Sequence, residues 1–199
     1  LQSLEELPAW RIWQEYILVD YPIHRVALRT NAEDFMMYYE RFFYNRQMRP
    51  EIPAVLATIQ KMGLKIGLIS NVCSRGQVPV NLEQYGIRHY FDPLVLSSEY
   101  GRRKPDPAIF HHAARLANVP TSQCAYVGDR IARDIMGAHK AGFSLAVQIR
   151  HDFAHGEADD GAVPDAIISQ MTELLDILNT ELSRPVTAQP GNIRALLFD

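Results

Sequence analysis

Polar side chains follow four apolar runs of the sequence, at or shortly after the points where strands of a sheet are expected to end. They are Ser70 and Asn71, Lys104, Asp129 with Asp134 five residues later, and Asp199. If the sheet is parallel, these strand ends share one edge and the side chains converge there. Carboxylates suit Mg²⁺, which takes hard oxygen ligands and keeps some of its waters. A hydroxyl and an ammonium suit the oxygens of a phosphate. The set indicates metal-assisted handling of a phosphoryl group.

Each feature also has an ordinary structural explanation when it is taken alone. The pair at 70–71 fits a turn after a strand, and Lys104 fits a solvated basic turn. Asp129 and Asp134 fit the capping of a helix and the complementation of its dipole. Asp199 fits an ordinary polar terminus. The chemical interpretation therefore depends on the combination.

The apolar periodicity predicts strands that alternate with helices. The expected strands are 64–70, 94–97, 125–129, 145–149, 166–168 and 193–198. The expected helices are 50–62, 77–85, 106–117, 131–141 and 171–182. This alternation is typical of an α/β protein with a doubly wound parallel sheet.

Residues 1–48 have a different character, with many aromatic and charged side chains at helical spacing. We expect a small helical subdomain there, with Asn31 as the N-cap of its second helix. The remaining divisions are an α/β core at 49–182, a tether at 183–192 and a separate core strand at 193–199.

The composition is that of an ordinary globular protein. The chain has 199 residues, 47% hydrophobic and 22% charged, with a formal net charge of −3. Without a long basic stretch, the sequence does not favour a nucleic-acid or membrane-surface partner. No apolar run is long enough to span a membrane, and the first residues do not form a signal peptide. The only cysteines, Cys73 and Cys124, fit a reducing, cytoplasmic location better than a disulfide scaffold.

Three segments taken together resemble the haloacid dehalogenase superfamily. They are 66–71, which ends in Ser70-Asn71, 104–110, which begins Lys-Pro-Asp-Pro, and 127–142, which contains Gly128-Asp129 and Asp134. The similarity runs from about residue 50 to 182 and is greatest to the phosphatase branch that carries a helical cap. Residues 1–48 occupy the place of that cap. The last strand resembles the first half of the family's Asp-x-Asp motif.

The resemblance implies a role for each candidate residue. Asp199 resembles the nucleophile that forms an aspartyl-phosphate, and Ser70, with Asn71 beside it, would contact the phosphoryl group. Lys104 would neutralise charge on the nucleophile and the phosphate. Mg²⁺ would be held by Asp129 and Asp199, with support from Asp134 directly, through water or through Lys104.

The sequence departs from the family pattern in its order. The nucleophile strand comes last, and the family's second aspartate, a general acid and base two residues after the nucleophile, is not among the 199 residues. A circular permutation, a tandem protein cut inside a second copy, and a record that places the first strand last are all compatible with this order. The first and third predict that strand 193–198 lies in parallel between the strands at 64 and 125. The expected sheet order is 145, 125, 193, 64 and 94.

The resulting hypothesis is Mg²⁺-dependent hydrolysis of a small phosphomonoester through an aspartyl-phosphate. The expected partner is a small phosphorylated metabolite, and the expected state is a monomer or homodimer. Two alternatives remain open: a degenerate phosphatase fold that binds or regulates without catalysis, and a 2-haloacid dehalogenase, which needs no metal.

Overall fold

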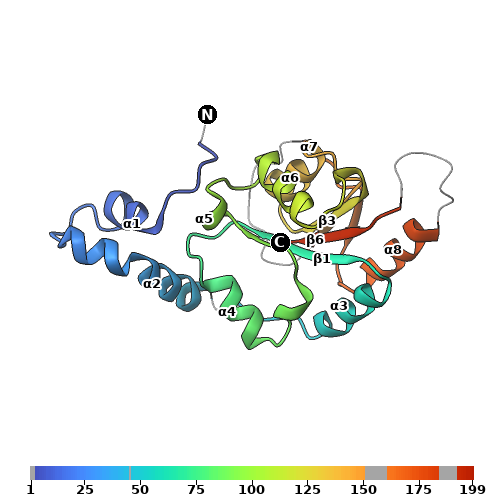
Figure 1. Cartoon of the computed structure of the whole chain (residues 1–199), viewed down its shortest axis with the longest axis horizontal. Coiled ribbons are helices and arrows are strands. Elements are labelled where there is room, and N and C mark those ends of the chain that lie inside the picture. Colours follow the sequence, from blue (N-terminus) through green and yellow to red (C-terminus); the bar gives the residue numbers. More distant parts are fainter. Residues whose placement is uncertain (1–2, 45, 151–160, 184–191) are drawn as a thin grey trace.

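The described part of the chain contains one six-stranded sheet with helices packed around it (Figure 1). The computed structural model describes residues 3–44, 46–150, 161–183 and 192–199. The sheet order is β2-β1-β6-β3-β4-β5, and every neighbouring pair is parallel. The strands are β1 (Lys65–Ser70), β2 (Leu94–Leu96), β3 (Cys124–Gly128), β4 (Leu145–Ile149), β5 (Ala166–Ile168) and β6 (Ala195–Phe198). The expected order is confirmed, and β5 extends the sheet beyond β4.

Strand β6, the last element of the chain, lies in the middle of the sheet. It pairs in parallel with β1 on one side and with β3 on the other, and Phe198 lies opposite both Leu68 and Val127. Its four residues are buried, with Ala195 and Leu197 in one core cluster and Leu196 and Phe198 in the other. A run of apolar residues without polar alternation is what a strand covered on both faces requires. The predicted intramolecular placement of this strand is confirmed.

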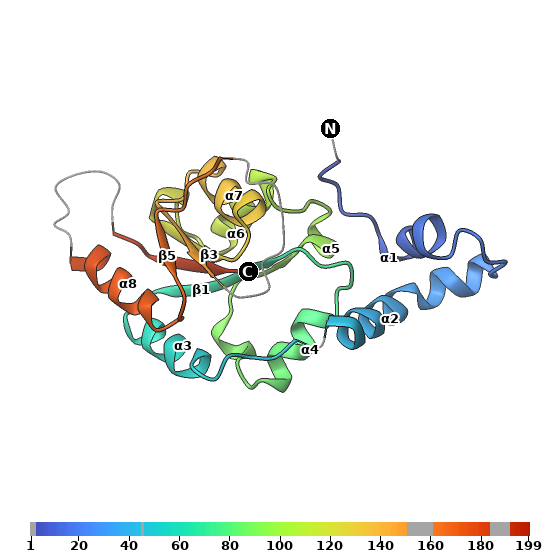
Figure 2. The ribbon, with the colours of Figure 1, turned by 180° about the vertical axis from the view of Figure 1, so that it is seen from behind.

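Helices cover both faces of the sheet, as Figures 1 and 2 show from opposite sides. On one face lie α3 (Ile52–Lys61) and α8 (Glu173–Ser183), and on the other α6 (Pro107–Leu116) and α7 (Met136–Lys140). Asp106 caps α6, and its carboxylate accepts a hydrogen bond from the Ala108 amide. The other helical elements of this part are α4 (Gln77–Gln84), α5 (Ser97–Tyr100), a π-helical turn η4 (Ile131–Ile135), and the 3₁₀ turns η2 (Arg88–Tyr90) and η3 (Thr121–Gln123).

The N-terminal part is helical and extends away from the sheet in both views (Figures 1 and 2). It comprises α1 (Ala9–Ile12), a π-helical turn η1 (Trp13–Ile17) and α2 (Arg25–Tyr44). These helices share a small core in which Ala9, Ala32 and Met36 are buried against Trp10 and Trp13. The described helices agree with a separate helical subdomain, although the exact division at residue 48 remains a prediction. The expected tether lies mainly at 184–191, outside the described residues.

The predicted N-cap at Asn31 is wrong. Helix α2 begins six residues earlier, and the Asn31 side chain donates a hydrogen bond to the Ala27 carbonyl within the helix. The imidazole Nδ1 of His24 accepts from the Ala27 amide and satisfies the first turn instead. The longer helix is favoured because Leu28 is buried on the same face as Ala32 and Met36.

Among the described helices, none combines the length and the apolar character that crossing a bilayer requires.

The central position of β6 predicts a large loss of stability when its core side chains are shortened. Leu196→Ala should lower the free energy of unfolding by about 2–5 kcal/mol, because Leu196 is fully buried and its removal leaves a cavity. Urea denaturation measures this difference. The exposed neighbour Arg194→Ala is the control and should change it by less than about 0.5 kcal/mol. Equal small effects of both variants would contradict the central docking of β6.

Candidate active site

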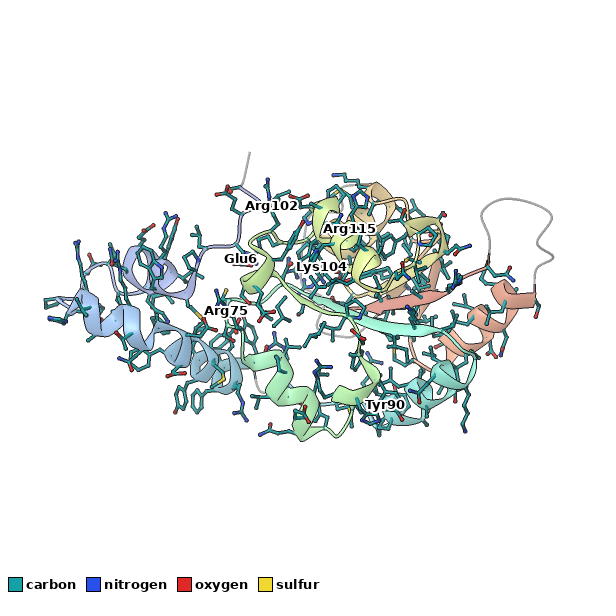
Figure 3. All side chains as sticks on the ribbon, viewed as in Figure 1. Glu6, Arg75, Tyr90, Arg102, Lys104 and Arg115 are labelled. Carbon is teal, nitrogen blue, oxygen red and sulfur yellow. The ribbon has the colours of Figure 1, made fainter. Side chains whose placement is uncertain are left out.

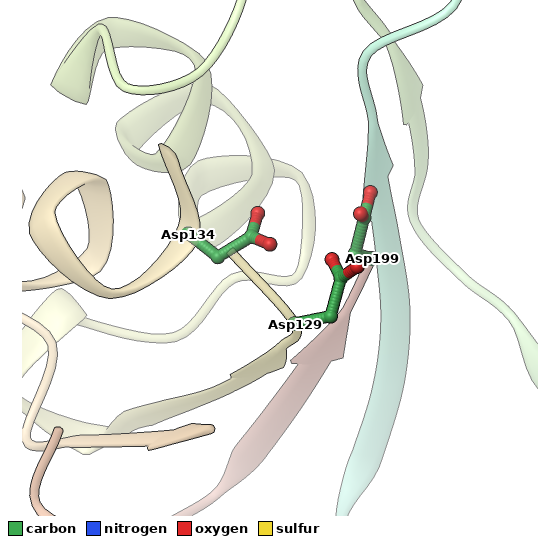
Figure 4. Close-up of side chains that lie close together, drawn as sticks. All are labelled: Asp129, Asp134 and Asp199. Atoms are coloured by element: carbon green, nitrogen blue, oxygen red, sulfur yellow. The ribbon is translucent and has the colours of Figure 1, made fainter. Parts of the chain in front are cut away.

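Three aspartates meet at the carboxyl edge of the sheet (Figure 4). Asp199 directly follows β6, Asp129 follows β3, and Asp134 lies in η4. One oxygen of each carboxylate lies within 4.8 Å of the others. The backbone amide of Asp199 donates to the Val127 carbonyl at 3.0 Å, so sheet pairing extends up to the site. The sequence predicted this convergence because parallel strands present their carboxyl ends at one edge.

The ammonium of Lys104 lies among these carboxylates. Its Nζ is 2.5 Å from Asp199 Oδ1 and 2.7 Å from Asp134 Oδ1, and it donates to the Tyr126 hydroxyl at 2.9 Å. The Lys104 side chain is 2% exposed, whereas that of Asp199 is 32% exposed. The alternative of a solvated basic turn is therefore wrong for Lys104. A buried ammonium with three oxygen partners is held in one position.

Burial and neighbouring charges shift the pKa values of Lys104, Asp199 and Tyr126. Burial alone would lower the pKa of Lys104, but Asp134 and Asp199 raise it above its ordinary value. Burial raises the pKa of Asp199, and the Lys104 ammonium opposes this rise. The pKa of Tyr126 is raised by burial and by the same two carboxylates, so its hydroxyl stays protonated. The cluster therefore contains a charged ammonium and a neutral phenol at neutral pH.

Asp134 is packed tightly and fully engaged. Its Oδ1 contacts Lys104 and lies 3.3 Å from the Tyr126 hydroxyl, while its Oδ2 accepts from the Arg130 amide at 3.0 Å. Gly128 permits this packing, because a Cβ at that position would lie 2.5 Å from the Asp134 side chain. Asp134 thus accepts from the amide that precedes η4 and also contacts Lys104.

Asn71 and Ser70 reach the site from β1. The Asn71 amide exchanges two hydrogen bonds with the main chain of Lys104, at 2.8 Å and 3.0 Å. Its side chain thereby fixes the segment that carries Lys104, and a contact between Asn71 and substrate remains a prediction. Ser70 is half-buried, and its hydroxyl has no hydrogen-bond partner within the part of the chain that the structure describes. That hydroxyl is available to a ligand.

Tyr126 is a site residue that the sequence reasoning missed. It lies in the middle of β3, is fully buried, and bridges Lys104 and Asp134 through its hydroxyl. The available signal was a tyrosine in a wholly apolar strand two residues before Gly128, since a buried phenol needs a hydrogen-bond partner.

The donor set fits a divalent cation. Two oxygens bound to one Mg²⁺ lie at most about 4.2 Å apart, because each bond is about 2.1 Å. The observed spread of up to 4.8 Å needs only a small adjustment. Asp129 and Asp199 are the better direct ligands, since the oxygens of Asp134 already accept from Lys104 and the Arg130 amide. Asp129 also contacts the Arg130 guanidinium at 3.3 Å, so metal binding would compete with that ion pair.

Removal of the buried ammonium should destabilise the metal-free protein in a pH-dependent way. At neutral pH, Lys104→Met should cost about 3 kcal/mol, because two carboxylates lose their counter-charge. Without Lys104 the pKa of Asp199 rises further, so the folded variant takes up a proton more readily than the unfolded chain. The deficit relative to the unaltered protein should therefore be smallest near the ordinary pKa of Asp199, 3.8, and grow over the range from there to about pH 8.

Urea denaturation with EDTA across that range measures this deficit. The contribution of Lys104 itself is fully present below its ordinary pKa of 10.5. A deficit that is the same at both ends of the range would contradict the assigned coupling between Lys104 and Asp199.

The sequence is similar to one family of hydrolases and to proteins named as phosphatases or nucleotidases. The family model for haloacid dehalogenase-like hydrolases matches residues 9–142, which include Ser70, Lys104, Asp129 and Asp134. The chain is 36% identical over 151 residues to a glyceraldehyde 3-phosphate phosphatase of Methanopyrus kandleri, with 74% of this chain and 63% of the relative covered. It is 39% identical over 115 residues to the pyrimidine 5'-nucleotidase YjjG of Escherichia coli, with 57% and 49% covered. The chain thus spans about half to two thirds of the length of these relatives.

Solved structures share the fold. A 2-haloacid dehalogenase from Pseudomonas syringae pv. Tomato DC3000 superposes with a TM-score of 0.62 and 26% identity, covering 86% of this chain and 70% of that one. A HAD phosphatase from Thermococcus onnurineus gives a TM-score of 0.62 at 24% identity, with 85% and 70% covered. The family model spans most of the chain, and the three carboxylates and the buried lysine occupy the carboxyl edge of its sheet. The chain belongs to the haloacid dehalogenase-like hydrolase family.

Proposed function

We propose that the protein hydrolyses a small phosphomonoester with Mg²⁺ through an aspartyl-phosphate on Asp199. The observation that carries this proposal is the convergence of three carboxylates within 4.8 Å around a buried ammonium. Relatives named as phosphatases support the reaction class.

In the proposed reaction, an oxygen of Asp199 attacks the phosphorus, and the bond from phosphorus to the leaving oxygen breaks. Lys104, in contact with Asp199, offsets negative charge on the carboxylate and the transferring group. The Ser70 hydroxyl donates to a phosphoryl oxygen. Water then cleaves the aspartyl-phosphate and restores the carboxylate. In the family pattern the proton for the leaving oxygen comes from an aspartate two residues after the nucleophile, a position beyond residue 199.

Mg²⁺ would be held by Asp129 and Asp199, with Asp134 supporting it through water or through Lys104. When bound, the metal would offset charge on the phosphoryl oxygens and help to orient the group. The three carboxylates bring oxygen atoms within 4.8 Å of one another, and oxygen is the ligand that Mg²⁺ prefers.

The helical part at 1–48 is proposed to be the cap that selects the substrate. The substrate class that we propose is a small phosphorylated metabolite, in agreement with the names of the relatives. A cytoplasmic location, a monomeric or homodimeric state and the lack of a nucleic-acid partner remain predictions.

Dehalogenation is the second candidate, because one solved relative of the same fold is a 2-haloacid dehalogenase at 26% identity. We favour phosphate chemistry because both Asp129 and Asp134 lie at the site beside Asp199. Halide release without a metal would not need these two additional carboxylates.

Metal binding is the first prediction of this proposal. Mg²⁺ at about 100 times its dissociation constant should stabilise the chain by about 2.7 kcal/mol, seen as a rise in Tm. Asp129→Asn should remove most of this rise. Asp176→Asn, the same change on the exposed side of α8, is the matched control and should keep it. An equal Mg²⁺ response in the two variants would exclude Asp129 as a ligand.

Turnover is the second prediction. With Mg²⁺ the protein should hydrolyse p-nitrophenyl phosphate, and Asp199→Asn should lower kcat by about 10³-fold or more because the nucleophile is lost. EDTA should abolish turnover, and Asp176→Asn should preserve it. Halide release from 2-chloropropionate without Mg²⁺ would favour the dehalogenase. Phosphate binding without turnover would favour a non-catalytic module.

A further inference from the structure

The loop at 71–76 joins β1 to α4 and begins directly after Ser70. It is held by a carboxylate from the N-terminal helical part. Glu40 of α2 accepts hydrogen bonds from the Cys73 amide at 2.9 Å, the Ser74 amide at 3.1 Å and the Ser74 hydroxyl at 2.6 Å. Glu40 is only 5% exposed, and Ser74 is fully buried. These partners are 33 and 34 residues apart along the chain, so the contact joins two separate parts of the fold.

The carboxylate of Glu40 is satisfied by this loop and not by a cation. Among the described residues, no lysine, arginine or histidine forms an ion pair with it. Burying a carboxylate is costly unless hydrogen bonds replace its water. Three donors from two consecutive residues meet that need, so the position of the loop and the burial of Glu40 depend on each other.

One face of α2 makes the whole contact. Glu33 accepts a hydrogen bond from the Arg75 amide. Met37 packs so closely on Gly76 that a Cβ there would lie 2.5 Å from the Met37 sulfur. Together with Glu40, these residues have the i, i+4, i+7 spacing of a single helix face. The helix therefore covers the loop from residue 73 to residue 76.

The contact continues from the loop to the proposed site. The Val72 amide donates to the Ser97 hydroxyl at 3.0 Å, and that hydroxyl lies 2.7 Å from Glu6, another residue of the N-terminal part. Asn71, two residues before Cys73, holds the main chain of Lys104. Figure 3 shows Glu6, Arg75 and Lys104 gathered near this junction. The path from Glu40 to the main chain of Lys104 thus runs along residues 71–74 and through hydrogen bonds of 2.8–3.1 Å.

We propose that Glu40 is a positioning residue, which fixes Cys73 and Ser74 and thereby holds Ser70 and Asn71 in the geometry that engages a phosphate. The phosphate part rests on the proposed function. The position of the helical part on the loop would then determine the geometry of the phosphate contacts. Among the described residues, the hydrogen bonds of Glu40 all go to Cys73 and Ser74 and none to the three aspartates, so we propose that it acts through the loop.

The test compares Glu40→Gln with Glu15→Gln, the same change at an exposed residue of the N-terminal part that pairs with Arg11. Amide hydrogen exchange should become about 10-fold faster at Cys73 and Ser74 in Glu40→Gln only. The affinity for orthophosphate should fall about 10-fold, while the affinity for Mg²⁺ stays unchanged because its proposed ligands are untouched.

Cys73 provides an internal reporter. Burial, with added contributions from Glu6 and Glu40, raises the pKa of the Cys73 thiol to about 11. Loss of the Glu40 charge and a looser loop should both speed alkylation of Cys73. Cys124 is buried and provides the reference thiol. If Glu40→Gln does not fold, Ser74→Ala keeps the two amide contacts to Glu40 and removes the hydroxyl contacts to Glu40 and to the Gln77 amide. It should change exchange and phosphate affinity in the same direction to a smaller extent.

The outcomes separate the two proposals. Unchanged exchange at Cys73 and Ser74 would overturn the role of Glu40 in holding the loop. Faster exchange with unchanged orthophosphate affinity would overturn its positioning role. If the unaltered chain binds no orthophosphate, the proposed function and the phosphate part of this inference both fail, and hydrogen exchange still decides whether Glu40 holds the loop.

Discussion

The architecture of the site depends on the burial of one ammonium between two carboxylates. Lys104 is almost inaccessible to solvent and contacts Asp134 and Asp199, which come from a π-helical turn and from the end of the last strand. A buried cation is tolerated only when its partners are in place. Strand β6 lies between β1 and β3, and that position brings Asp199 to Lys104. The fold of the core and the chemistry of its edge are therefore linked.

Positive charge at the site comes from more than one side chain. The Lys104 ammonium contacts Asp134 and Asp199, the Arg130 guanidinium lies 3.3 Å from Asp129, and the charge of Arg133 opposes the raised pKa of Asp199. What favours a divalent cation is the gathering of oxygens from three carboxylates within 4.8 Å of one another, at the edge of the sheet where Ser70 also lies. Family membership and this set of oxygen ligands support the same proposed chemistry.

The sheet and the convergence of the aspartates could be predicted because they depend on local patterns. Runs of apolar residues such as 195–198 indicate buried strands, and parallel strands bring their carboxyl ends together. The roles of Tyr126, Asn71 and Glu40 could not be predicted in the same way. Their partners lie between 8 and 34 residues away, so the hydrogen bonds exist only after the fold has formed. Asn31 failed as a cap because a buried face extended the helix beyond it.

The most direct test of the shared cation site is a crystal structure of the protein grown with Mn²⁺, which gives an anomalous signal in place of Mg²⁺. The account predicts one anomalous peak within about 2.1–2.3 Å of carboxylate oxygens of both Asp129 and Asp199, with Lys104 still on Asp134. A folded protein in which Mn²⁺ is absent from this edge at saturating concentration, or touches only one of the two aspartates, would contradict it.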